Sequence, residues 1–242
     1  MAASPDTKIY VCTHTDFKPV VRNPVYETVD SRLINGDRCE NGLRGSFYSE
    51  LFHYKHIAEH FDLPKYVGVC GYRKYFSFMD KVPDIAAALR EHDAIAATPI
   101  ALGCKLRDHY AYYHNVQDLD IVTDIIAKHY QELLPDYRKS LTLPIMYAYN
   151  MFIVRREDFL DMIQTIYSII DEYLMVVGMD IDGRIEENPK AYHIGEMPFL
   201  TQKYQYRIGG LLGERITNAM LRHRFPKIKH YKAIVTQNAI RL

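Results

Sequence analysis

The sequence has 242 residues, enough for one α/β domain with a full apolar core, with two small domains as the second possibility. Its 30 Lys and Arg balance its 30 Asp and Glu, and this zero net charge argues against a nucleic-acid partner. Residues 1–10 lack the apolar run of a secretion signal, and no later run approaches the roughly 20 apolar residues of a membrane span. The four cysteines form no C-x-x-C pair, so reduced thiols are expected. We therefore expect a soluble, cytoplasmic protein.

The first expected strand is Lys8 to Thr13, and it runs into a polar loop, Thr13-His14-Thr15-Asp16. Loops of this kind bind nucleotides at the edge of α/β sheets. The alternative is that Thr13 and Asp16 only cap or close a turn. Residues 17–45 are irregular, with several Pro and Gly, and a loop of that length is usually functional or mobile.

A helix is expected over residues 46–61, with Ser46 as its cap and an apolar stripe of Phe47, Leu51, Tyr54, Ala58 and Phe61. Glu50 lies one residue from this stripe, so it either faces a site from the edge of the core or is exposed. The same helix contains His56-Ile57-Ala58-Glu59-His60, which matches the H-x-x-E-H pattern of zinc peptidases. The alternative for these histidines is a partly exposed helix surface.

Residues 65–76 are the expected centre of the sheet. A short apolar run, typical of a buried strand, ends in Tyr72, Arg73, Lys74 and Tyr75. In open α/β sheets, ligands bind beyond the carboxyl ends of the strands. Arg73 and Lys74 there suit a diphosphate, and the tyrosines suit a base or a sugar. The alternative is core aromatics with solvated cations.

The next two elements fix the expected fold class. Residues 83–92 read as a helix with Pro83 in its first turn, and residues 93–99 read as a strand. Strands and helices therefore alternate over the first hundred residues. This alternation predicts an α/β domain whose mainly parallel sheet is flanked by helices.

Residues 105–116 are polar and aromatic, and they include a candidate ligand surface of His109, Tyr110, Tyr112, Tyr113 and His114. Asp118-x-Asp120 follows, at the start of an expected amphipathic helix. D-x-D is a metal and nucleotide-diphosphate signature of many glycosyltransferases, whereas capping and the helix dipole explain the same two aspartates without a metal. We favour the second explanation and keep Asp118 and Asp120 as weak metal candidates.

The second half of the chain contributes further polar candidates. Residues 144–154 read as a strand, in which the amide of Asn150 either bridges backbone groups or addresses a ligand. A long amphipathic helix over residues 157–177 is expected to be structural. Near the end, Arg207 precedes glycines that can present amides to phosphate, and Glu214 and Arg215 form either part of a site or an ion pair.

The tail from Leu221 is basic in an otherwise neutral chain. It suggests contact with an anionic membrane surface that carries a lipid diphosphate. The alternative is a solvated face. The basic residues of this tail are Arg222, His223, Arg224, Lys227, Lys229, His230 and Lys232.

Six motifs are spread along most of the chain: KIYVCTH, FYSEL, YVGVCGYRKYF, HNVQDLDIV, AYNMFIVRRE and YRIGGLLGERI. In this order and spacing they resemble a bacterial family, long catalogued as a domain of unknown function, whose assigned members are galactofuranosyltransferases of O-antigen and capsule assembly. The resemblance implies a single GT-A-like domain over residues 1–242, with a nucleotide-binding half at about 1–116 and an acceptor-side half at about 117–242. It also implies sugar transfer from a UDP-sugar to a glycan on a lipid carrier.

Carried over by position, the resemblance assigns Thr13 and His14 to the nucleotide and Tyr72, Arg73 and Tyr75 to the donor. It places Glu50, Asn150, Arg207, Glu214 and Arg215 around the reacting sugar. The chain departs from the family pattern at Gly71, where a histidine is usual, and in having no tryptophan after Leu51. These departures suggest a different sugar from galactofuranose or a loss of activity.

As a hypothesis, the enzyme inverts the anomeric carbon of a UDP-hexose, with Glu50 as general base and Glu196 as the second choice. Arg73 and Arg207 would stabilise the departing diphosphate, so no cofactor is required, although Mn²⁺ or Mg²⁺ remains an alternative. A non-catalytic protein that binds nucleotide-sugars or glycans is the second hypothesis. A zinc hydrolase using His56, Glu59 and His60 is the third.

Overall fold

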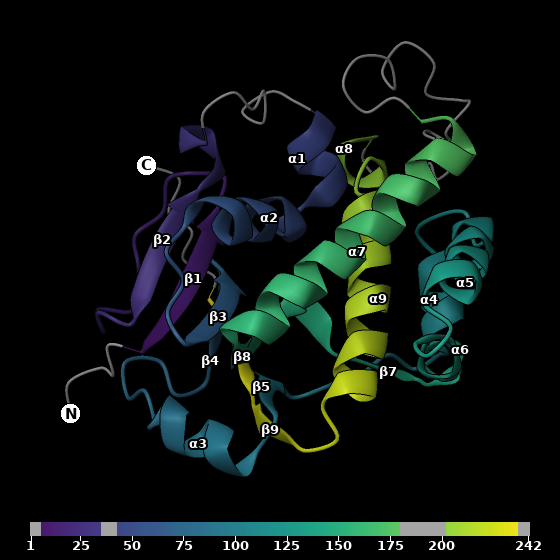
Figure 1. Cartoon of the computed structure of the whole chain (residues 1–242). Helices are drawn as coiled ribbons and strands as arrows, with labels where there is room; N and C mark the ends of the chain where they lie inside the picture. Colours follow the sequence, from purple (N-terminus) through teal and green to yellow (C-terminus); the bar gives the residue numbers. More distant parts are fainter. Residues whose placement is uncertain (1–5, 35–42, 180–201, 237–242) are drawn as a thin grey trace.

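The computed structural model describes residues 6–34, 43–179 and 202–236 (Figure 1). Its main sheet has six strands in the order β2-β1-β3-β8-β5-β9. Their bounds are β1 Thr7–Thr13, β2 Tyr26–Asp30, β3 Tyr66–Gly71, β5 Ala94–Ala97, β8 Phe152–Arg155 and β9 Ile228–Tyr231. Only β8 is antiparallel to its neighbours, β3 and β5. The prediction of a mainly parallel sheet flanked by helices is confirmed.

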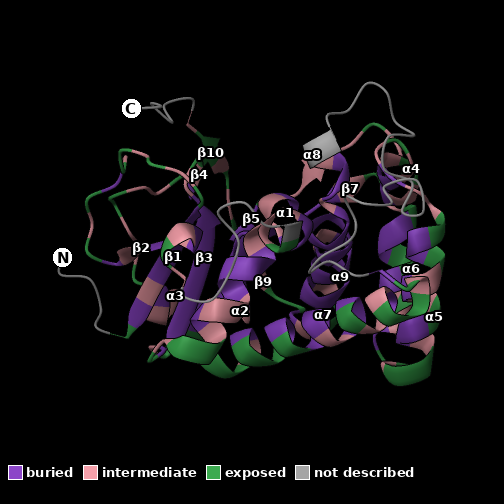
Figure 2. Ribbon diagram, turned by 90° about the horizontal axis from the view of Figure 1, so that it is seen from above, coloured by how far each residue is buried: buried purple, intermediate pink, exposed green. Residues whose placement is uncertain are grey.

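Helices cover both faces of this sheet. Because successive side chains of a strand point to opposite faces, alternate residues of the central strands pack into two different apolar clusters, one on each face. Val67 and Val69 of β3 pack into the larger cluster, and Tyr66 and Cys70 pack into the smaller one. The larger cluster includes α1 Leu43–Tyr48, α2 Glu50–His60, α5 Gln117–His129, α7 Arg156–Val177 and α9 Ile208–Arg224. The smaller cluster lies under α3 Ile85–Glu91. Figure 2 shows the result, with buried strands and with an exposed outer face along α7.

Shorter elements complete the described chain. Two small antiparallel pairs join β4 Lys74–Phe76 to β10 Ala233–Val235 and β6 Ile100–Ala101 to β7 Ile145–Met146. The remaining helices are α4 Leu106–Ala111, α6 Leu134–Thr142 and α8 Gln202–Gln205, and the 3-10 turns are η1 Ser31–Leu33 and η3 Ala148–Asn150. Over the residues that the structure describes, no helix is both long and apolar enough to cross a membrane.

Two expected elements are broken in the structure. The helix expected over residues 46–61 is two helices, separated by Ser49 at φ 54° and ψ −128°, so the expected cap at Ser46 is wrong. The strand expected over residues 144–154 is interrupted by η3, where Tyr149 and Asn150 have φ of 73° and 50°. Positive φ is costly for residues other than glycine, and such strain is concentrated at functional sites.

Two segments for which no strand was predicted contain strands. Residues 17–45 include the edge strand β2, in which only Val29 is buried. The basic tail includes β9, which forms the other edge of the sheet, and β10. Edge strands with few buried residues lack the apolar signal by which strands are recognised in a sequence.

The first turns of α9 pack unusually close to the junction of α1 and α2, and glycine makes this possible. A Cβ on Gly209 would lie 2.3 Å from Phe47 Cε1, and one on Gly210 would lie 2.7 Å from Ser49 Cβ. A Cβ on Gly213 would lie 2.2 Å from Leu51 Cδ1. These glycines therefore serve helix packing, and the sequence-based idea that they present amides to phosphate is not needed to explain them.

We expect Gly209→Ala to destabilise the fold, because the added methyl overlaps the fully buried Phe47 ring. Overpacking costs about 1–3 kcal/mol, which exceeds the gain of up to about 1 kcal/mol from replacing a helical glycine. Urea unfolding measures the change. Gly71→Ala is the matched control, because a Cβ there meets nothing within 4 Å. Equal stability of the two variants would contradict the packing role.

Candidate active site

Charged side chains from three elements gather where the carboxyl edge of the sheet meets the starts of α2 and α9. We call Glu50, Lys74, Arg207, Glu214 and Arg215 the charged cluster. Glu50 opens α2, Lys74 opens β4, and the other three lie at the start or in the first two turns of α9. Figure 1 shows α1, α2 and the upper end of α9 close together above the sheet. Four of these five residues were expected at the reacting sugar, and the structure brings them together.

Glu50 is an ionised carboxylate in this setting. Its Oε2 lies 3.7 Å from Nη2 of Arg207. Burial opposes its ionisation, but Arg207 and Lys74 outweigh burial and hold the pKa of Glu50 below its ordinary value. Arg207 is itself fixed, because its Nε donates to Ser49 Oγ at 2.9 Å and its guanidinium lies 5.4 Å from the centre of the Tyr204 ring.

Glu214 has the opposite electrostatic setting. Burial and the nearby Glu50 raise its pKa, although Arg215 partly opposes them. Its Oε2 is 3.1 Å from Arg215 Nη1, and its Oε1 accepts from the backbone N–H of Tyr149 at 3.2 Å. The ion pair that the sequence left open therefore exists, and it also holds the strained turn at Tyr149.

Arg215 connects this pair to α4. It is 1% exposed, and its Nη1 also donates to the carbonyl of Leu211 at 3.1 Å. Its Nη2 donates to His109 Nδ1 at 2.9 Å, so the proton of a neutral His109 lies on Nε2. Arg215 is therefore a fixed charge that orients Glu214 from one side and His109 from the other.

Lys74, which the sequence paired with Arg73 as a candidate for holding a diphosphate, is the third cation of the cluster. Its Nζ lies 4.0 Å from the centre of the Tyr149 ring. Burial lowers its pKa, whereas Glu50 and Glu214 favour its charged form. With Arg207 and Arg215 it gives the cluster three cations against two carboxylates, an arrangement that suits an anion such as a diphosphate.

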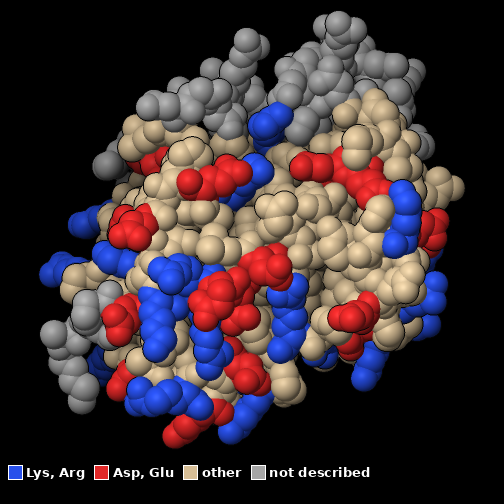
Figure 3. All heavy atoms as spheres, in the orientation of Figure 1, with Lys and Arg blue, Asp and Glu red and all other residues tan. Residues whose placement is uncertain are grey.

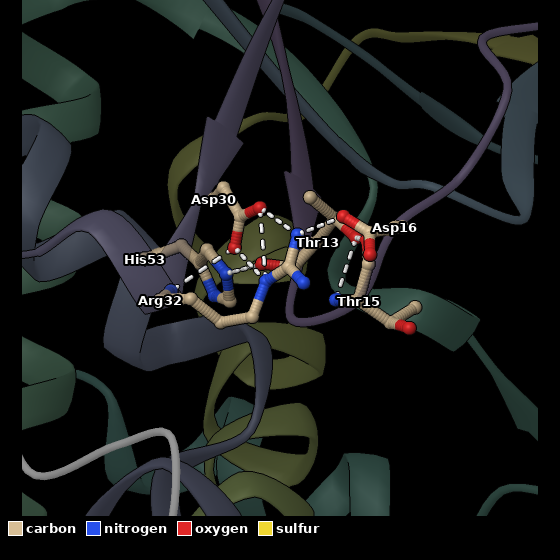
Figure 4. A network of polar contacts seen from close by, with 6 residues as sticks. All are labelled: Thr13, Thr15, Asp16, Asp30, Arg32 and His53. Carbon is tan, nitrogen blue, oxygen red and sulfur yellow. Dashed lines mark hydrogen bonds and ion pairs between the residues drawn. The ribbon is translucent and has the colours of Figure 1, made fainter. Parts of the chain in front are cut away.

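A second polar group lies beside the cluster, at the ends of β1 and β2 (Figure 4). Arg32 Nε donates to Asp30 Oδ1 at 3.0 Å, and its Nη2 donates to Asp30 at 2.5 Å and to Asp16 at 2.6 Å. Burial opposes the ionisation of Asp30, but the bonds from Arg32 outweigh burial and keep the pKa of Asp30 below its ordinary value. The arginine thus ties the loop after β1 to the end of β2.

Thr13 is held in the same network. Its hydroxyl donates to the carbonyl of Thr15 at 2.7 Å, as in the turn that the sequence allowed. Its own carbonyl accepts a hydrogen bond from His53 Nε2 at 2.7 Å, and burial lowers the pKa of that histidine. Asp30, Arg32 and His53 were not expected here. The H-x-x-E-H comparison drew attention to the exposed end of the same helix instead.

The expected donor residues fall into two groups. His14 and Phe17 lie edge-on to Tyr72, with ring centres 5.5 Å and 5.6 Å away, and Arg73 lies over that ring at 5.1 Å. These rings flank the end of β1 and are accessible in part. Tyr75 is not among them, because it is fully buried in the smaller apolar cluster, with its ring 6.1 Å from Tyr26.

Asn150 lies in the strained turn next to Tyr149. It is 2% exposed, its backbone carbonyl accepts from the Tyr54 hydroxyl at 3.0 Å, and its Oδ1 has no hydrogen-bond partner in the described chain. A buried amide oxygen without a partner is costly and calls for a ligand or water. Glu196, the second choice of base, lies outside the described residues.

Neither metal hypothesis finds a ligand set in the described parts of the chain, where no group of three or more His, Cys, Asp and Glu can hold an ion. Asp118 is buried and accepts from the hydroxyls of Tyr110 at 2.7 Å and Tyr173 at 2.9 Å, while Asp120 pairs with Arg107 at 2.8 Å. Neither aspartate makes the expected side-chain cap. In the zinc motif, Glu59 pairs with Lys55 at 3.0 Å.

The chain matches a sequence family and is similar in fold to a solved structure. No curated protein matches its sequence. Among solved structures it is similar to the apo structure of WbbM, described as a bifunctional glycosyltransferase, with a TM-score of 0.74 at 18% identity. The match covers 96% of this chain and 46% of that one, so the two share a fold and this chain spans less than half of the other's length. A sequence model of the family described as "Domain of unknown function (DUF4422)" matches residues 8–188, and the chain therefore belongs to this family.

Proposed function

We propose that the protein is a glycosyltransferase that moves a hexose from a UDP-sugar to a glycan or lipid-linked acceptor in cell-surface glycan synthesis. The observation that carries the proposal is the charged cluster, which combines an ionised Glu50 with three cations at the edge of a sheet where α/β proteins bind ligands. The fold shared with a bifunctional glycosyltransferase supports it. Galactofuranose is the favoured sugar, on the motif resemblance described above.

In the proposed reaction, Glu50 removes the proton from the acceptor hydroxyl, whose oxygen then attacks the anomeric carbon. The bond from that carbon to the diphosphate oxygen breaks, and UDP leaves with inversion. Lys74 and Arg207 stabilise the negative charge of the leaving diphosphate. Asn150 and Glu214 orient the reacting sugar. Thr13, His14 and Tyr72 hold the nucleotide.

The basic tail fits an acceptor held at the inner face of a membrane. Several basic residues of the tail already have partners within the described chain. His223 pairs with Asp136 at 3.0 Å, Arg224 pairs with Asp161, and His230 bonds the Tyr147 hydroxyl at 3.2 Å. Lys227, Lys229 and Lys232 remain exposed. Figure 3 shows both signs of charge interspersed over the face of the molecule that it displays, so we assign the tail a supporting role.

We expect UDP-sugars to raise the melting temperature of the protein, since a ligand at 100 times its dissociation constant adds about 2.7 kcal/mol of stability. Glu50→Gln should keep this shift and lower kcat by about 100-fold or more, because it removes only the base. Glu172→Gln is the matched control, a half-buried helical glutamate paired with Lys128 at 3.3 Å, away from the cluster. A wild-type protein that binds UDP-sugars without any turnover would favour the non-catalytic binding protein.

The pH dependence of turnover distinguishes the two glutamates. A general base works only when ionised, so activity falls as the pH drops through its pKa. The pKa of Glu50 lies below the ordinary value of 4.5 and that of Glu214 lies above it. We therefore expect the acid limb of kcat/KM below pH 4.5. An acid limb above that pH which disappears in Glu214→Gln would identify Glu214 as the base.

If Lys74 and Arg207 stabilise the leaving group, activity should survive EDTA. Lys74→Met should lower kcat by about 100-fold and reduce the thermal shift with UDP. Lys65→Met is the matched control, because Lys65 also lies over a tyrosine ring, 5.4 Å from that of Tyr66, at the opposite end of β3. Loss of activity in EDTA and its return with manganese would contradict this assignment.

A further inference from the structure

A group of aromatic rings lies next to the charged cluster, on α8 and on the segment that ends α4. We call Tyr113, Tyr204 and His114, with His109 and Tyr112 at their sides, the aromatic shelf. The ring centre of Tyr113 is 5.8 Å from that of Tyr204, 5.1 Å from Tyr112 and 5.2 Å from His109. The His114 ring is nearly parallel to that of Tyr204, at 6.3 Å and 16°. The candidate ligand surface predicted from the sequence included all of these residues except Tyr204, and the proposed reaction has not used them.

Core packing does not explain the outer rings of the shelf. Tyr110, in the same segment, is fully buried in the larger apolar cluster. Tyr113 is half-buried and belongs to none of the three apolar clusters of the described chain, whereas Tyr204 packs against the edge of the larger one. A large aromatic side chain at a surface, outside the apolar clusters, is typical of a binding site.

Two arginines of the charged cluster contact the shelf, and each of them also pairs with one of the two glutamates. Tyr204 lies under Arg207, which is 3.7 Å from Glu50. His109 accepts from Arg215, which is 3.1 Å from Glu214. A molecule lying on the shelf would therefore lie beside Arg207, the cation that pairs with the proposed base.

The shelf also offers a polar contact. His114 is 6% exposed, and its Nε2 is buried without a hydrogen-bond partner in the described chain. Burial lowers the pKa of His114 to about 4, so the ring is neutral at neutral pH. In either tautomer a neutral imidazole nitrogen can bond one hydroxyl group.

We propose that the aromatic shelf binds the acceptor sugar, with the C–H face of a hexose against Tyr113 and Tyr204 and a hydroxyl at His114. Aromatic faces supply apolar contact to the C–H side of a sugar ring, while the polar edge of that ring remains free for hydrogen bonds. That the bound sugar is the acceptor rests on the proposed function. Binding of a sugar at the shelf does not.

The test separates the two statements by measuring glycoside and nucleotide binding independently. Saturation-transfer NMR reports binding of methyl β-galactofuranoside, methyl β-galactopyranoside and methyl β-glucopyranoside, and thermal shift reports binding of UDP. We expect Tyr113→Ala to weaken glycoside binding by about tenfold and Tyr113→Phe to retain it, because only the ring is needed. The UDP shift should be unchanged in both variants.

Two further variants keep the test decisive. Tyr112→Ala changes a side chain that is 63% exposed, and it should weaken glycoside binding severalfold. Tyr130→Ala, at the far end of α5 with the His129 ring 6.4 Å away, should leave glycoside binding unchanged. Glycoside binding that depends on Tyr113 in a protein indifferent to UDP would uphold the sugar site while the transferase proposal failed. Glycoside binding unaffected by Tyr113→Ala, or absent from a wild type that binds UDP, would overturn the inference.

Discussion

The close contact between the α1–α2 junction and the first turns of α9 determines where Glu50 and Arg207 lie. Ser49 adopts a φ of 54°, which ends one helix and allows Glu50 to start the next. Gly210 lets Ser49 approach α9, so that its hydroxyl can accept from Arg207 at 2.9 Å. The backbone strain at Ser49 and the loss of side chains on α9 are both local costs. In return, Glu50 and Arg207, which lie on distant parts of the chain, are held 3.7 Å apart.

The charged cluster brings like charges close together as well as opposite ones. Glu50 disfavours the ionisation of Glu214, and Arg207 disfavours the charged form of Lys74. The two carboxyl groups therefore differ, since the pKa of Glu50 is lowered whereas the pKa of Glu214 is raised. Under the proposed function, the diphosphate of the donor would relieve the repulsion among the cations, and this relief would contribute to its binding.

The sequence predicted the elements that bury a long apolar pattern and missed those that do not. β1, β3, β5, α7 and α9 lie where expected, whereas β2 and β9 are edge strands with few buried residues. The break at Ser49 was hidden, because the apolar stripe continues from Phe47 to Leu51 across it. The motifs drew attention to the residues of α2 and α9 that the structure brings together in the charged cluster. The sequence grouped Lys74 with Tyr75, but Tyr75 is fully buried whereas Lys74 interacts with Glu50 and Glu214, because in a strand adjacent side chains point to opposite faces and only the fold shows which face is the core.

Gly71 is a position beside the candidate site at which the structure has room for a larger side chain. It ends β3 opposite Cys12 of β1, and the next residue, Tyr72, donates its backbone N–H to the carbonyl of Cys12 at 3.0 Å. A Cβ at Gly71 would meet nothing within 4 Å, so packing does not require glycine there. Gly71 is followed by Tyr72, Arg73 and Lys74, the segment to which the donor is proposed to bind. Under that proposal, a larger side chain at Gly71 would change which sugar fits without altering the charged cluster.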